Sequence, residues 1–174
     1  MCSGNCRIWS GDATASTGPT VTPPRPAVAR GFAGSTSPLP EACPCGGGAY
    51  DSCCAPLIRG RQLASTAEEL MRSRYSAFAL ALQESGAIDH LLRTHPEPGI
   101  SERQRRRELQ ATCAQTRWLE LMVLASRAGG SGDAEGTVEF QARWSQHGHS
   151  GVLAEHSRFG RGPEGQWLYL EALG

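Results

Sequence analysis

Residues 136–144 read GTVEFQARW, and this stretch decides the fold because its apolar and polar side chains alternate without a break. One face of the extended chain carries four apolar side chains: Val138, Phe140, Ala142 and Trp144. Three further stretches with strand character flank it: residues 116–125, 151–159 and 166–173. The connections between the four are short and rich in glycine, which is typical of hairpin turns. The pattern predicts a four-stranded antiparallel meander.

The chain before this meander has the period of helices. Thr66 followed by Glu69 is a capping box, which predicts that a helix starts there. Residues at helical spacing then form an apolar stripe: Leu70, Met71, Tyr75, Ala77, Phe78, Ala81 and Leu82. Arg74 falls inside the stripe, whereas three polar residues fall on the opposite side: Arg72, Ser73 and Ser76. Shorter helices are predicted at residues 87–94 and 101–113. Helices followed by strands predict an α+β domain with helices packed on one face of a curved antiparallel sheet.

Residues 43–54 read CPCGGGAYDSCC and hold four of the seven cysteines. Four thiolates in a closed site are typical of structural zinc, so we predict one Zn²⁺ held by Cys43, Cys45, Cys53 and Cys54. Cys53 and Cys54 are adjacent and cannot bridge each other without strain. An iron–sulfur cluster also uses four thiolates, but the usual spacings are missing. Such a small segment folds through its metal. Because the cysteines precede the first capped helix and lie outside the alternating strands, we expect residues 61–174 to fold without it.

Residues 1–42 are rich in small and polar residues and in proline, which predicts a disordered tail. Its serines, threonines and arginines leave an organellar transit peptide as the alternative. Clustered cysteines favour a reducing compartment, so we expect a cytoplasmic protein. A formal net charge of zero disfavours a nucleic-acid-binding surface. No apolar run approaches the ~18 residues that a membrane span requires.

Two parts of the chain resemble known sequence families. CPCGGGAYDSCC resembles the SEC-C motif, a small zinc knuckle, and LMRSRYSAF, HLLRTHPEP, GTVEF, EHSRF and WLYLE resemble the YchJ-like family of uncharacterised bacterial proteins. The resemblance implies a knuckle at residues 43–60 joined to a cone-shaped, nuclear-transport-factor-2-like (NTF2-like) domain at residues 61–174. It also implies that the four cysteines are the zinc ligands. The loop between Cys45 and Cys53 is one residue shorter than usual and lacks lysine, so we expect Arg59 and Arg61 to offset the thiolate charge.

A second candidate site lies inside the predicted domain. Strand alternation places Glu155 and Ser157 on the interior face, where a carboxylate needs a partner. Arg74 is the natural partner, and we favour a buried, two-fold hydrogen-bonded pair. The alternative is a polar patch in a cone-shaped pocket with Trp167 and Tyr169 in its wall. His90 and His95 are candidate bases, but the spacing gives neither of them a partner.

Two functions are compatible with these patterns. The first is an adaptor that performs no chemistry and binds a protein through the knuckle or a small ligand in the cone. The alternative is a pocket enzyme of the isomerase, dehydratase or hydrolase type, and its support is analogy between folds alone. The absence of a spaced acid–base pair in the sequence favours the adaptor.

Overall fold

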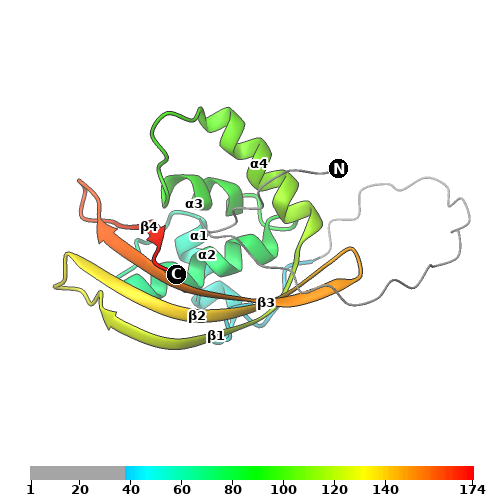
Figure 1. Cartoon of the computed structure of the whole chain (residues 1–174), viewed down its shortest axis with the longest axis horizontal. Helices are drawn as coiled ribbons and strands as arrows, with labels where there is room; N and C mark the ends of the chain where they lie inside the picture. The colour runs from blue at the N-terminus through cyan, green and yellow to red at the C-terminus, as the bar shows by residue number, and fades with distance from the viewer. Residues whose placement is uncertain (1–37) are drawn as a thin grey trace, which may run out of the picture.

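The computed structural model describes residues 38–174 (Figure 1). Its elements follow in chain order: a 3₁₀ helix η1 (Tyr50–Ser52), α1 (Ala55–Ile58), α2 (Ala67–Leu80), α3 (Ala87–Arg93), α4 (Glu102–Gln115), β1 (Arg117–Ala128), β2 (Glu135–Gln146), β3 (His149–Arg161) and β4 (Trp167–Ala172). The predicted tail lies outside the described residues up to residue 37. The three predicted helices and four predicted strands are all present, and the fold is α+β as predicted.

The sheet is an antiparallel meander in the order β1-β2-β3-β4, and the helices lie on one side of it (Figure 1). Interior positions of β2 follow the predicted alternation, with Val138, Phe140 and Ala142 fully buried. Phe140 pairs with Glu155 across β2 and β3, which places the carboxylate on the same interior face. Register shifts in β1 interrupt its pairing with β2 at two places, consistent with a curved edge of the sheet.

Helix α2 is the central helix, because it packs against the sheet on one side and against α1 and α3 on the other. Its start is capped as predicted: Glu69 N–H donates to Thr66 Oγ1 at 3.1 Å. The prediction that Ser73 and Ser76 lie on an outer face is wrong, because both are fully buried under the knuckle and α3. Leu82 is 64% exposed although it continues the apolar stripe, because α2 ends at Leu80.

The cysteine segment packs into the core of the domain. Cys43, Cys45 and Tyr50 belong to the same hydrophobic cluster as α2 and the sheet. The ordered segment also begins before residue 43, because Ala42 pairs with Ala49 and Tyr50 N–H donates to Glu41 O at 2.8 Å. Within the described part of the chain, no helix is long and apolar enough to cross a membrane.

Candidate metal centre

The structure brings together the four cysteines that the sequence singled out. The sulfur atoms of Cys43, Cys45, Cys53 and Cys54 all lie within 4.8 Å of one another. Individual Sγ–Sγ distances are 3.4 Å for Cys43–Cys45, 3.5 Å for Cys45–Cys53, 3.6 Å for Cys45–Cys54 and 3.8 Å for Cys53–Cys54. A tetrahedral Zn²⁺ with Zn–S distances of ~2.3 Å places its sulfurs ~3.8 Å apart. The donor set and its dimensions therefore fit a four-coordinate thiolate site.

The glycine loop gives the cluster its compact shape. Cys43 N–H donates to Gly48 O at 2.7 Å, and Gly46 N–H donates to Cys43 O at 2.9 Å. A Cβ on Gly47 would lie 2.9 Å from Cys53 Sγ and 3.3 Å from Cys45 Sγ. Because carbon and sulfur cannot approach so closely, only glycine leaves room for the sulfurs at this position.

The thiols cannot all ionise independently when they are this close. Hydrogen bonds from the thiols of Cys45 and then Cys54 lower the pKa of Cys43, and the bond to Cys43 raises the pKa of Cys54. Burial raises the pKa of Cys53 to about 12. A cation at the centre of the cluster would be needed to hold all four as thiolates.

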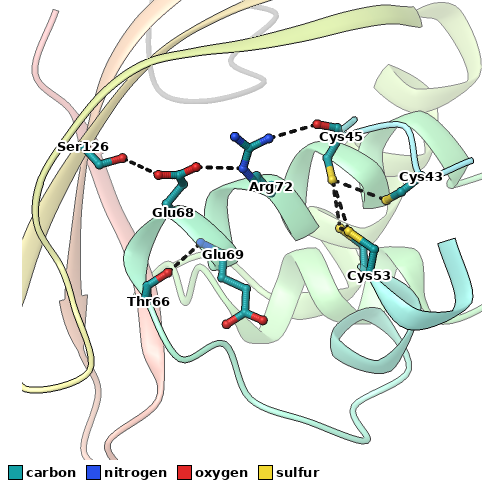
Figure 2. A network of polar contacts seen from close by, with 9 residues as sticks. Cys43, Cys45, Cys53, Thr66, Glu68, Glu69, Arg72 and Ser126 are labelled. Carbon is teal, nitrogen blue, oxygen red and sulfur yellow. Dashed lines mark hydrogen bonds and ion pairs between the residues drawn. The ribbon is translucent and has the colours of Figure 1, made fainter. Parts of the chain in front are cut away.

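Helix α2 supplies the polar surroundings of the cluster. The Ser76 hydroxyl lies 3.4 Å from Cys43 Sγ, where it can donate to a thiolate. Arg72 donates to Cys45 O at 3.0 Å and pairs with Glu68 at 2.8 Å, and Ser126 of β1 donates to Glu68 at 2.7 Å, so one chain of contacts joins β1 to the cluster (Figure 2). The Ser126 hydroxyl, followed by Arg72, lowers the pKa of Glu68.

Arg59 holds the cluster against the end of α2. We expected Arg59 and Arg61 to offset the thiolate charge, but Arg59 pairs with Glu84 at 2.9 Å and with Asp51 at 3.2 Å. The buried Glu84 carboxylate also accepts from Tyr50 O–H at 3.0 Å. Arg72, which the sequence placed on an outer face, is instead the arginine that binds the backbone of the cluster.

The predicted Arg74–Glu155 site is buried but arranged differently. Arg74 donates to Thr94 Oγ1 at 2.7 Å and to Leu91 O at 3.1 Å, and its guanidinium lies 5.1 Å from the centre of the Tyr169 ring. Glu155 Oε1 accepts from Ser157 Oγ and, at 3.3 Å, from Tyr169 O–H. Glu155 Oε2 has no hydrogen-bond partner among residues 38–174, so the two-fold bonded pair does not form. Tyr169 therefore lies between the two charges.

Burial dominates the electrostatics of this interior cluster. It raises the pKa of Glu155 to about 6, although Ser157, Tyr169 and Arg74 act in the opposite direction. Burial, together with Arg74 and Arg105, lowers the pKa of His95 to about 3. His95 meets the edge of the Tyr169 ring with 4.8 Å between ring centres. Only 4% of Glu155 is exposed, so a dissolved substrate has no direct access to it.

A serine–histidine pair that the sequence did not reveal lies between α2 and α3. His90 Nε2 is 2.9 Å from Ser73 Oγ, and Arg93 donates to His90 Nδ1 at 2.9 Å. Ser73 O–H donates to Leu70 O at 2.8 Å, so the histidine carries its proton on Nε2. Both side chains are buried, and burial holds the pKa of His90 well below its usual range, so the ring is neutral where it meets Ser73. Helical spacing could not reveal this pair, since the serine lies on α2 and the histidine lies on α3.

Two surface pockets lie away from Glu155. A pocket of about 160 Å³ lies between the knuckle and the domain, and its wall includes Leu57, Leu63, His90 and Trp167. Trp167 lines this junction pocket, whereas Tyr169, the other predicted wall residue, lines neither of these two pockets. A wider pocket of about 420 Å³ lies between α3 and α4, where Arg105 pairs with Glu97 and Arg106 pairs with Asp89.

Comparison with known proteins agrees with this architecture. Residues 66–172 match the family model described as the middle NTF2-like domain of YchJ. A UPF0225 protein of Chromobacterium violaceum is 42% identical over 139 residues, which is 76% of this chain and 92% of that protein. A UPF0225 protein of Ralstonia nicotianae is 40% identical over 144 residues, or 78% of this chain and 93% of that protein.

A crystal structure of a SEC-C motif containing protein from Psychrobacter arcticus has a similar fold. Its TM-score is 0.57 at 24% sequence identity, and the match covers 75% of this chain and 81% of that one. The fold and the cysteine cluster define a class of small protein in which an NTF2-like domain carries an N-terminal four-cysteine knuckle. Within this class, the chain belongs to the YchJ-like family, and the two relatives named above are UPF0225 proteins.

Proposed function

We propose that this protein is a zinc-binding adaptor in which Cys43, Cys45, Cys53 and Cys54 hold one Zn²⁺ and the metal fixes the knuckle on the NTF2-like domain. The convergence of four sulfurs, three of them buried, carries this proposal. Zinc suits the donor set because it accepts four thiolates in a closed tetrahedral site and has no redox chemistry of its own. A reducing compartment such as the cytoplasm, predicted from the cysteine usage, is the setting in which such thiolates persist.

The junction pocket supports a binding role for the knuckle. Its volume of about 160 Å³ is below the ~300–1,000 Å³ that small-molecule pockets occupy, and suits one apolar side chain of a protein partner. Leu63 lines the pocket and is 68% exposed. Since α1, α3 and β4 each contribute to the wall, the pocket depends on the knuckle remaining docked. We therefore propose that the partner is a protein that binds at this pocket, and not a small ligand that binds inside the cone.

A capture experiment with purified, zinc-loaded protein tests the adaptor role. We expect a partner held by the native chain to be released by a zinc chelator and by Leu63→Asp. The matched control is Leu82→Asp, because Leu82 is equally exposed at 64% but does not line the pocket. A partner retained by Leu63→Asp, or released equally by both variants, would contradict this surface as the binding site.

A further inference from the structure

The four sulfurs of the metal centre differ in their access to solvent. Cys43, Cys45 and Cys54 are each at most 4% exposed, whereas Cys53 is half-buried. The neighbouring loop, Gly46–Gly48, is exposed and has no side chains to cover the sulfurs. No heavy atom lies within 4 Å of the position that a Cβ on Gly46 or Gly48 would take. A small molecule can therefore approach Cys53 past bare backbone.

The polar contacts of the Cys53 sulfur are with other sulfurs alone within the described part of the chain. They join it to Cys45 at 3.5 Å and Cys54 at 3.8 Å, whereas Cys43 has the Ser76 hydroxyl at 3.4 Å. No basic residue occurs between Cys45 and Cys53 in the sequence. Hydrogen bonds and nearby cations reduce the electron density available at a metal-bound thiolate. Cys53 is thus the most exposed of the four sulfurs, and no hydroxyl among residues 38–174 contacts it as Ser76 contacts Cys43.

We propose that Cys53 is a modification site for hydroperoxides and that its oxidation releases the bound metal; this rests on the proposed zinc site. The Cys53 thiolate attacks the terminal peroxide oxygen, the O–O bond breaks, and the peroxide leaves as an alkoxide, or as hydroxide from hydrogen peroxide, while the sulfur becomes a sulfenic acid. The Cys45 thiolate then attacks this sulfur, forming an S–S bond and expelling hydroxide. Two thiolates have given up two electrons, and the peroxide has received them.

Cys45 is the favoured resolving residue. Its sulfur is nearer to Cys53 than that of Cys54, and the adjacent Cys53–Cys54 pair is strained as a disulfide. Loss of two ligands frees the metal, because the remaining two cannot close a tetrahedral site. Tyr50 and Ile58 share the core with the cysteines, so metal release would also loosen the docked knuckle.

The test uses the zinc-loaded full chain carrying Cys2→Ser and Cys6→Ser, two positions outside the described residues. Hydrogen peroxide is added below stoichiometric amounts, zinc release is followed with a chromogenic chelator, and free thiols are alkylated before mass spectrometry. Chymotrypsin cleaves after Tyr50, which separates Cys45 from Cys53 unless a disulfide joins them. We expect one zinc released per peroxide consumed, a Cys45–Cys53 bridge, and an unmodified Cys113, which is buried.

Two histidine variants test the choice of sulfur. Cys53→His keeps a Cys₃His donor set and should slow peroxide-driven zinc release by about tenfold or more. Cys54→His replaces a buried ligand and should leave the rate within about twofold of the parent. If neither variant binds zinc, the chymotryptic peptide mapping of the parent chain identifies the oxidised sulfur by itself.

Zinc release with Cys53 still a free thiol, or zinc fully retained under peroxide, would overturn the inference. A chain purified from cells without zinc would instead contradict the proposed function, and this inference with it.

Discussion

Gly47 lies so close to the cysteine cluster that a side chain there would collide with two sulfurs. Its backbone is not in the left-handed region, so a substitution there meets only the sulfurs of Cys53 and Cys45. We expect Gly47→Ala to weaken zinc binding by about tenfold or more, because the added methyl group must push two ligands apart, at a cost of roughly 1.4 kcal/mol. Competition with a chelator of known zinc affinity measures the change.

Gly132→Ala is the matched control for this experiment. Gly132 also avoids the left-handed region, and a Cβ there would meet no heavy atom within 4 Å. Its zinc affinity should equal that of the native chain. If Gly47→Ala binds zinc as tightly as Gly132→Ala, the sulfurs do not occupy the positions that the structure gives them.

Glu155 makes the stability of the fold depend on pH. Its pKa in the folded protein is raised from 4.5 to about 6, mainly by burial, so the folded state holds its proton more tightly than the unfolded chain. The free energy of unfolding should therefore fall as pH rises from about 4.5 to 6, by about 2 kcal/mol from this group. Glu155→Gln cannot titrate, and urea unfolding across this range should lose that slope.

Glu139→Gln provides the comparison for the pH experiment. Glu139 lies on β2 with its side chain exposed, so removing its charge should leave the pH dependence of the native chain intact. A slope that survives in Glu155→Gln would mean that a group other than Glu155 takes up the proton.

At the scale of elements, Glu84 joins the knuckle to the end of α2. Its carboxylate accepts from Tyr50 next to the cysteines and pairs with Arg59 after α1. We expect Glu84→Gln to lower the free energy of unfolding by roughly 1–3 kcal/mol, because buried hydrogen bonds to a charged group are lost. Asp51→Asn removes the other partner of Arg59, but Asp51 is 84% exposed, so its cost should stay below about 1 kcal/mol. Equal costs in urea unfolding would show that Glu84 does not hold the knuckle.

Helix α2 shows what the sequence could and could not predict about an element. Its start followed from the Thr66 cap, and Leu70 and Phe78 are buried as the apolar stripe required. Ser73 and Ser76 were predicted on the side opposite the apolar stripe, which is usually the exposed side of such a helix. In the structure that face is covered by α3 and the knuckle, where Ser73 bonds His90 and Ser76 lies beside Cys43. Helical spacing describes one helix and contains no information about a second covering layer.

At the scale of the whole molecule, local patterns were sufficient for the sheet and for the cysteine cluster. Alternation and turn residues predicted the β1-β2-β3-β4 meander, and the density of cysteines predicted the cluster. The packing of the knuckle into the common core was not predictable, because the local sequence of residues 43–60 carries no information about its contacts with α2. For the same reason Glu155 was correctly placed inside, while the insertion of Tyr169 between it and Arg74 was missed.

In the proposed function, four cysteines hold one zinc ion against α2. X-ray absorption at the zinc edge of the purified full chain, combined with elemental analysis, tests it most directly. We predict one zinc per chain with four sulfur ligands at ~2.3 Å and no nitrogen or oxygen ligand. A chain without zinc, or zinc with mixed sulfur and lighter ligands, would contradict the account.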